Sequence, residues 1–205
     1  MLEIPRESIK RLGDMIIQYG YSFHLAEGNE LIRTSPDDEP LFFYLVKGQV
    51  RYELSDDYWL SSVRAPMVLG FVDYYYPNEY AGRFFTETET SGFYLSAEKV
   101  GQLISENDLW YDVSVILSYI IRRLLAREML LSSSNAYKII CHYLNILNSE
   151  CPEVKERLSA LYYLHKHTKL SKSMISLIIS ELKKGEYIDI SKGHLKSIKF
   201  LPESF

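Results

Sequence analysis

Basic and hydroxyl side chains at helical spacing near the C-terminus are the residues of this chain best suited to bind another molecule. Residues 172–184 (KSMISLIISELKK) are expected to form a helix, because Ser171 can cap its start and Gly185 favours its end. Isoleucine and leucine recur along this segment at helical spacing and predict a buried face. The exposed first turns then carry Lys172, Ser173 and Ser176. Lysine can donate to a guanine edge or a phosphate, and serine is short enough to let a helix approach base edges or backbone.

The segments around this helix predict a winged helix-turn-helix. A short helix over 160–168 and a tight turn at 169–170 precede it, and a β-hairpin formed by YIDI, a turn at 191–194 and LKSIKF follows it. In this order of elements the second helix enters a major groove, while the turn and the wing contact phosphates and set position rather than sequence. The predicted DNA contacts are Lys169, Ser171, Lys172, Ser173, Ser176, Lys192, His194 and Lys196. A winged domain that serves protein contacts or packing is the alternative.

The distribution of charge favours a polyanion-binding segment. The chain carries 23 Lys and Arg against 27 Asp and Glu, a net charge of −4, yet residues 155–199 hold ten basic and four acidic side chains. A basic quarter on an acidic body is typical of a segregated nucleic-acid-binding module. On charge alone, a solvated lysine-rich face explains the same counts.

A small β-roll is expected to precede this module. Residues 4–19 carry apolar side chains at helical spacing and predict a short lead helix. After Gly20, short aromatic and β-branched runs alternate with Pro, Asp and Asn turn signals, as is typical of antiparallel strands. The polar run 86–90 (TETET) predicts an edge or outer strand. From Ser96, which can cap a helix, the pattern is helical again, so the expected fold class is α+β.

A long helix is predicted from about residue 107 to residue 131. Its roughly 24 residues would extend about 36 Å, which is longer than a small β-roll can cover. Part of its apolar stripe is therefore expected to meet a second copy of the chain, although packing on its own roll and C-terminal domain is the alternative. The predicted dimer seam is Val113, Leu117, Ile120 and Leu124.

A hinge at residues 132–134 (SSS) would divide the chain into three parts. These are a sensor roll over 1–104, a dimerisation helix over 105–131 and a winged helix-turn-helix domain over 132–205. Two recognition helices related by a two-fold axis would reach successive major grooves, about 34 Å apart, and would need a pseudo-palindromic operator.

The order of β-roll, long helix, hinge and winged helix-turn-helix covers essentially the whole chain and resembles the CRP/FNR superfamily of bacterial transcription regulators. Residues 170–188 (LSKSMISLIISELKKGEYI) are similar to that family's recognition-helix signature, and residues 44–50 (YLVKGQV) resemble its strand-turn-strand with a glycine. The resemblance implies a homodimeric, cytoplasmic regulator of transcription, with RNA polymerase as a candidate partner.

A narrower resemblance concerns the enterobacterial IprA-like group, the inhibitors of hydrogen peroxide resistance. It rests on residues 109–110 (LW), the stretch through 135–137 (NAY), and the ending from 192–193 (KG) to 201–202 (LP) with a closing aromatic residue. This resemblance implies a role in oxidative-stress physiology.

The superfamily resemblance also locates an effector pocket, from which this chain departs. Cyclic-nucleotide-binding members use a short helix N-terminus, a Gly-Glu pair whose Glu binds the ribose, and an Arg that pairs with the phosphate. Here Gly70 keeps the glycine, Phe71 stands in place of the Glu, and Tyr80 occupies the arginine register, with Arg83 about three residues away. A buried anion without these partners would cost roughly several kcal/mol, so no tight cAMP binding is expected. The neighbouring aromatic residues are expected to fill the pocket; a flat apolar ligand is the alternative.

Other functions find less support in the residues. The catalytic and phosphate-binding motifs GxSxG, GxxxxGK[ST], HExxH and GxGxxG are absent, so no enzyme is expected. A cupin-like metal site would need several histidines on the barrel strands, and this region has a single one, so neither a metal nor a cofactor is expected. A disulfide between Cys141 and Cys151 is geometrically possible but has no support. No signal peptide or membrane span is recognisable. A ligand- or protein-binding adaptor that has lost DNA affinity is the alternative function, and it would lack a steep salt dependence on duplex DNA.

Overall fold

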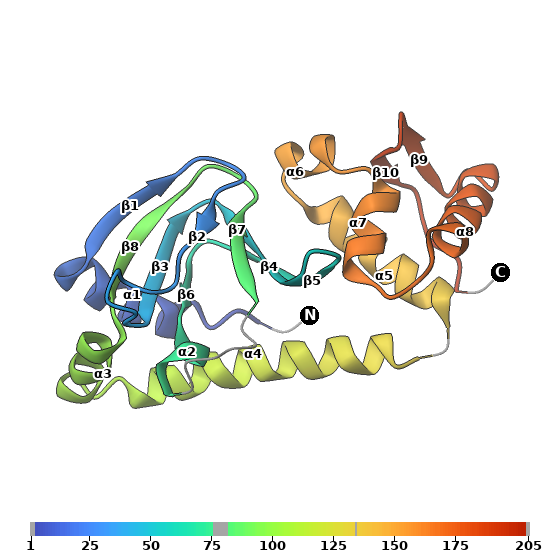
Figure 1. Cartoon of the computed structure of the whole chain (residues 1–205). Coiled ribbons are helices and arrows are strands. Elements are labelled where there is room, and N and C mark those ends of the chain that lie inside the picture. The colour runs from blue at the N-terminus through green and yellow to red at the C-terminus, as the bar shows by residue number, and fades with distance from the viewer. Residues whose placement is uncertain (1–2, 76–81, 134, 204–205) are drawn as a thin grey trace. The chain divides into compact units, whose positions relative to one another are not determined.

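The computed structural model describes residues 3–75, 82–133 and 135–203 and divides into two compact units (Figure 1). The first unit comprises Met1–Ser55 and Leu60–Leu125, and the second comprises Asp56–Trp59 and Ala126–Phe205. The 56–59 turn, which consists of a turn at 56–57 and the first two residues of strand β5 (Tyr58–Arg64), belongs to the unit formed by the C-terminal part of the chain. Among the helices of the described residues, none combines the length and the apolar composition that crossing a membrane requires.

The first unit is an antiparallel β-roll made of two four-stranded sheets, in agreement with the predicted fold class. One sheet has the order β1-β8-β3-β6, with β1 Tyr21–Leu25, β8 Thr90–Ser96, β3 Leu41–Lys47 and β6 Met67–Leu69. The other has the order β2-β7-β4-β5, with β2 Glu30–Leu31, β7 Arg83–Thr86, β4 Gln49–Ser55 and β5 Tyr58–Arg64. Five successive residues of β3 are buried, because this strand is covered on both faces.

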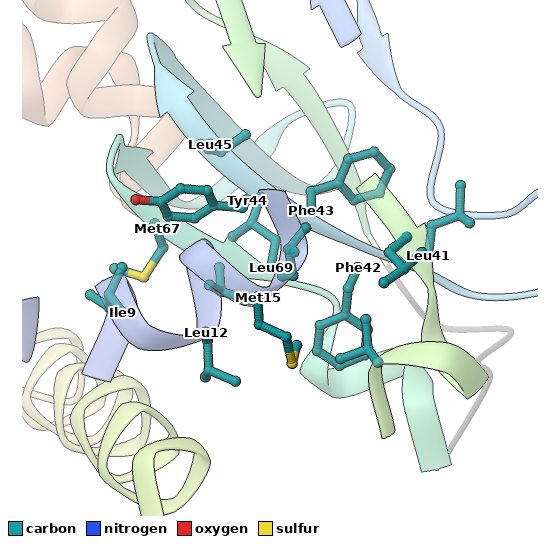
Figure 2. Close-up of a cluster of buried hydrophobic side chains, with 14 of the residues drawn as sticks. Ile9, Leu12, Met15, Leu41, Phe42, Phe43, Tyr44, Leu45, Met67 and Leu69 are labelled. Carbon is teal, nitrogen blue, oxygen red and sulfur yellow. The ribbon is translucent and has the colours of Figure 1, made fainter. Parts of the chain in front are cut away.

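Helix α1 (Arg6–Tyr19) is the predicted lead helix, and it covers the sheet that contains β3. Figure 2 shows its residues Ile9, Leu12 and Met15 next to the buried side chains of β3 and β6. Gly13 makes this close approach possible, since a Cβ atom there would collide with the Tyr44 ring. Apolar burial of this kind contributes about 25 cal/mol per Å² removed from water.

Helix α2 (Phe71–Tyr75) lies between β6 and β7, and α3 (Ala97–Glu106) and α4 (Trp110–Leu131) follow β8. The predicted cap of α3 is confirmed, because Ser96 Oγ accepts a hydrogen bond from the Lys99 backbone N–H at 3.4 Å. The first turn of α4 is tied to α1 by Arg11, whose Nη2 lies 3.4 Å from the buried Asp112 Oδ1. Helix α4 begins three residues later than the prediction and ends at the predicted residue.

The polar run 86–90 does not form the exposed edge strand that its composition predicts. It links β7 to β8, and Thr86, Glu87 and Thr90 are fully buried. The Gln49 side-chain amide donates to Glu87 Oε2 at 2.7 Å, and Thr86 Oγ1 donates to the Ala26 carbonyl at 2.7 Å. The prediction was wrong because the partners that make burial of these polar groups possible are far away in the sequence.

The second unit contains α5 (Ala136–Ser149), α6 (Pro152–Arg157), α7 (Ala160–His167) and α8 (Lys172–Lys184), followed by the antiparallel hairpin of β9 (Ile188–Ser191) and β10 (His194–Ile198). Ile140, Leu144, Leu164, Ile175 and Leu182 are fully buried at its centre. Trp59 is only 3% exposed and belongs to this same core. The predicted helix, turn, helix and wing are thus confirmed.

Candidate nucleic-acid interface

The turn between α7 and α8 is fixed by hydroxyl side chains. Thr168 Oγ1 donates to the Leu164 carbonyl at 2.8 Å and accepts from the Leu170 N–H at 3.3 Å, which ends α7. Ser171 Oγ accepts from the Met174 N–H at 3.3 Å, which confirms its predicted role as the N-cap of α8. Because a cap has its side chain turned to the helix backbone, Ser171 is better placed to orient α8 than to read a base.

Helix α8 turns one apolar face inward and leaves its first turns open. Ile175 and Leu182 are fully buried, and Ile178 and Ile179 are partly buried against the same core. The side chains predicted to meet DNA are exposed on the opposite side of the helix, and they are Lys172, Ser173 and Ser176. An exposed, lysine-bearing helix start that is held rigidly from behind is what insertion into a major groove requires.

Two apolar residues on this exposed side were missed by the sequence prediction. Met174 is 43% exposed and Leu177 is 60% exposed. Leu177 follows Ser173 by four residues, so the two side chains are neighbours on the helix surface. On a helix that enters a major groove, an exposed apolar side chain in this position can contact a thymine methyl group. The spacing from Ser173 to Leu177 was a signal that the sequence already contained.

The wing carries its lysines at two different places. Lys192 and Gly193 form a two-residue turn in which both residues have positive φ, 50° and 86°, as in a type I′ hairpin. Their turn is held against the start of α7, because the Gly193 carbonyl accepts from the Ala160 N–H at 2.8 Å. Lys192 at the tip and Lys196 on β10 are exposed, whereas His194 is half-buried with its Nδ1 atom shielded from solvent. Of the three predicted wing contacts, Lys192 and Lys196 are therefore the more accessible.

The 56–59 turn engages two further basic residues of this unit. Lys166 is buried, and its Nζ donates to the Asp56 carbonyl at 2.5 Å and to Asp57 Oδ1 at 3.0 Å. The hydrogen bond from Lys166 lowers the pKa of Asp57, with smaller contributions from other basic groups. Lys169, a predicted phosphate contact, is exposed, and its Nζ lies 5.8 Å from the centre of the Tyr58 ring. Lys166 thus contributes to the packing of this unit, and Lys169 keeps access to solvent.

A second feature of this core is His167, which is 2% exposed and enclosed by aromatic rings. The ring centroids of Tyr163, Tyr143 and Trp59 lie 4.4, 5.3 and 5.6 Å from that of His167. Neither ring nitrogen of His167 has a hydrogen-bond partner among the described residues. Burial, reinforced by the positive charge of Arg127, lowers the pKa of His167 to about 3. This histidine is therefore a neutral core residue at physiological pH.

Three of the four residues predicted to mark the effector pocket lie in the described part of the first unit. Gly70 has φ of +119°, and a Cβ there would lie 2.8 Å from the Leu41 carbonyl oxygen. Phe71 packs edge-to-face on Phe42, with ring centroids 5.2 Å apart. Arg83 is exposed on β7, with its guanidinium 5.2 Å from the centre of the Phe85 ring. Tyr80 lies outside the described residues.

The residues of the predicted dimer seam lie in two environments, some in the core of the roll and some on the surface of α4. Val113 is 6% exposed and packs in the core of the first unit, and Leu117 and Ile120 are partly buried against that core. Leu124 is 40% exposed and has exposed apolar neighbours on the same helix, namely Ile121, Leu125 and Met129. Val113 therefore serves the packing of the roll, and the exposed stripe extends further toward the C-terminus than predicted.

Cys141 and Cys151 are not joined by a disulfide. Burial raises the pKa of the Cys141 thiol, which makes the reactive thiolate less available at neutral pH. The described residues contain no group of three or more His, Cys, Asp or Glu side chains arranged to hold a metal ion.

The winged unit matches a known protein family, and nearly the whole chain is similar to solved structures. A family described as winged helix-turn-helix DNA binding matches residues 136–203. Among solved structures, the c-di-GMP responsive global regulator CLP of Xanthomonas campestris superposes with a TM-score of 0.72 at 16% identity, covering 95% of this chain and 99% of that one. A CRP/FNR family transcriptional regulator from Thermus thermophilus gives a TM-score of 0.66 at 17% identity, covering 87% and 95%. The chain has the CRP/FNR fold.

Curated relatives extend the comparison over the full length of this CRP/FNR-fold protein. The inhibitor of hydrogen peroxide resistance of Escherichia coli K12 is 25% identical over 201 residues, which cover 98% of this chain and 97% of the relative. The protein of the same description from Salmonella typhimurium LT2 is 26% identical over 204 residues, covering 100% and 99%. Both resemblances inferred from the sequence are thus confirmed, and the similar solved structures named above are regulators rather than enzymes.

Proposed function

We propose that this protein is a transcription regulator that binds duplex DNA through α8 and its wing. The observation that carries the proposal is the exposed first part of α8, where Lys172, Ser173, Ser176 and Leu177 are presented by a helix whose opposite face is buried. Lys192 and Lys196 on the wing, and Lys169 at the turn, add positive charge for the flanking phosphates. A regulator of this kind would act in the cytoplasm, where it meets DNA and RNA polymerase.

The proposal includes a homodimer formed along α4. Its exposed Ile121, Leu124, Leu125 and Met129 make an apolar stripe that a second copy could cover. Two copies of α8 would then read two half-sites about 34 Å apart on a pseudo-palindromic operator. The three-part division at 1–104, 105–131 and 132–205 assigns sensing, dimerisation and DNA binding to successive segments.

We further propose that DNA binding is independent of cAMP. Phe71 offers no acceptor to a ribose hydroxyl, and the guanidinium of Arg83 lies over a phenylalanine ring on the surface of the roll. The full-length relatives suggest that the regulated genes concern hydrogen peroxide resistance.

Fluorescence anisotropy of the purified chain on random duplex DNA, at several salt concentrations and with or without cAMP, tests the proposal. A steep negative slope of log affinity against log salt, unchanged by cAMP, is expected, because lysine–phosphate contacts release counterions. Binding that requires cAMP would contradict the interpretation of Phe71. A folded protein without affinity for DNA at any salt concentration would favour the adaptor function instead.

A further inference from the structure

A cavity of about 170 Å³ lies inside the first unit, between α2, α3 and the first half of α4. Of the predicted cyclic-nucleotide residues that the structure describes, Phe71 lines this cavity, whereas Gly70 and Arg83 do not. Its size is informative, since an engineered apolar cavity of about 150 Å³ in another protein binds benzene. The cavity is thus large enough for one aromatic ring and too small for a nucleotide.

One wall of the cavity is aromatic. Phe42 of β3 meets Phe71 and Tyr74 of α2 edge-to-face, with ring centroids 5.2 and 6.1 Å apart. Gly101 of α3 makes this arrangement possible, because a Cβ atom there would collide with the Tyr74 hydroxyl. Ring edges and faces arranged in this way favour a further aromatic ring in offset or edge-to-face contact.

The other wall is aliphatic and is formed by Ile104 of α3 with Val113 and Leu117 of α4. No Asp, Glu, Lys, Arg or His side chain belongs to the described lining, so a charged ligand would lose its hydration without a counter-ion. A neutral ligand is the one that these walls favour.

The polar groups at the rim already have partners. Ser114 Oγ donates to the Trp110 carbonyl at 2.8 Å, and Trp110 Nε1 donates to Ser105 Oγ at 3.2 Å. An apolar molecule can therefore enter without leaving these donors unsatisfied, and a strongly polar molecule would gain little from them.

We propose that this cavity binds a small, neutral molecule built on a single aromatic ring. Helix α4 supplies four of its lining residues, and Leu117 belongs both to the cavity wall and to the predicted dimer seam. A ligand in this cavity would thus contact the helix on which the proposed dimer depends.

Titration of the full-length chain with fluorobenzene, followed by ¹⁹F NMR, tests the proposal. Leu117→Trp should fill the cavity and weaken binding at least tenfold, whereas Leu117→Ala should keep or strengthen it. Tyr111→Trp is the matched control, because it places an indole on the exposed surface of α4 outside both the cavity and the proposed dimer stripe. Equal losses in the two tryptophan variants would overturn the proposal.

The position of the bound ligand is also measured in the unmodified protein. The proposal can therefore be tested even if a variant fails to fold. Intermolecular nuclear Overhauser effects between toluene and the methyl groups of Ile104, Val113 and Leu117 are expected. Absence of saturable binding up to the solubility limit of toluene, or contacts with methyl groups elsewhere, would refute the assignment.

Discussion

Lowering the pH should destabilise the second unit through His167. A solvated histidine has a pKa of about 6.5, whereas the pKa of the buried His167 is about 3. Between these values the unfolded chain binds a proton that the folded chain does not bind. The free energy of unfolding therefore falls as the pH drops below about 6.5, by at most about 1.4 kcal/mol per pH unit, and becomes independent of this group below the folded pKa.

From pH 7.5 to pH 5.0 this difference amounts to about 2 kcal/mol for His167 alone. The positive charge of Arg127 acts on His167 in the same direction as burial, burial raises the pKa of Tyr143, and the indole of Trp59 has no titratable group. His142 also has a pKa lowered by burial, so the total loss of stability contains a contribution from a second histidine. A difference between variants is needed to isolate His167.

Urea unfolding followed by tryptophan fluorescence provides the measurement. The chain has two tryptophans, and Trp110→Phe would leave Trp59, which lies in the core of the second unit, as the reporter. On this background His167→Phe replaces one buried ring by another of similar size and removes the titration. The variant should lose about 2 kcal/mol less stability between pH 7.5 and 5.0 than its parent. Equal losses would refute the view that the fold keeps this histidine neutral.

The remaining predictions concern the proposed interface and dimer. Lys172→Ala should reduce the binding free energy for a selected operator by about 1–3 kcal/mol and that for random DNA by less. Lys192→Ala should weaken binding to all sequences alike and reduce the slope of log affinity against log salt by about one. Fluorescence anisotropy on both kinds of DNA distinguishes the two effects. Leu177→Ala should lower the preference for thymine over uracil at one operator position by roughly 1 kcal/mol, the value of one buried methyl group, and a variant that treats both bases like its parent would exclude the methyl contact. Leu124→Asp should give folded monomers by light scattering, because Leu124 is exposed in the single chain; a persistent dimer would place the seam elsewhere.

Much of the fold could be predicted because its signals are local. The caps at Ser96 and Ser171 are formed by residues three positions from their partners, and the wing turn needs the glycine that the sequence places at Gly193. The order of such elements was enough to indicate the winged domain. Exposure of the first turns of α8 followed from the same periodicity.

Errors arose where distant residues decide the environment. The buried Glu87 depends on Gln49, and the inward position of Val113 depends on the aromatic residues of α2 and β3. A lysine is expected at the surface, yet Lys166 is buried and donates hydrogen bonds to Asp56 and Asp57, which lie over a hundred positions away in the sequence. No local pattern contains this information, because it concerns pairs of residues that only folding brings together.

The membership of the 56–59 turn in the second unit has a consequence for folding and for fragments of this protein. Because Trp59 is contributed from far along the chain, the core of the winged unit cannot be completed by the C-terminal segment alone. A polypeptide that starts at residue 126 would leave a vacancy where the indole packs against Tyr162 and His167. Contacts so distant in sequence also raise the contact order, which slows folding. During synthesis on the ribosome, Trp59 would emerge long before its partners, so this core can close only after nearly the whole chain has been made.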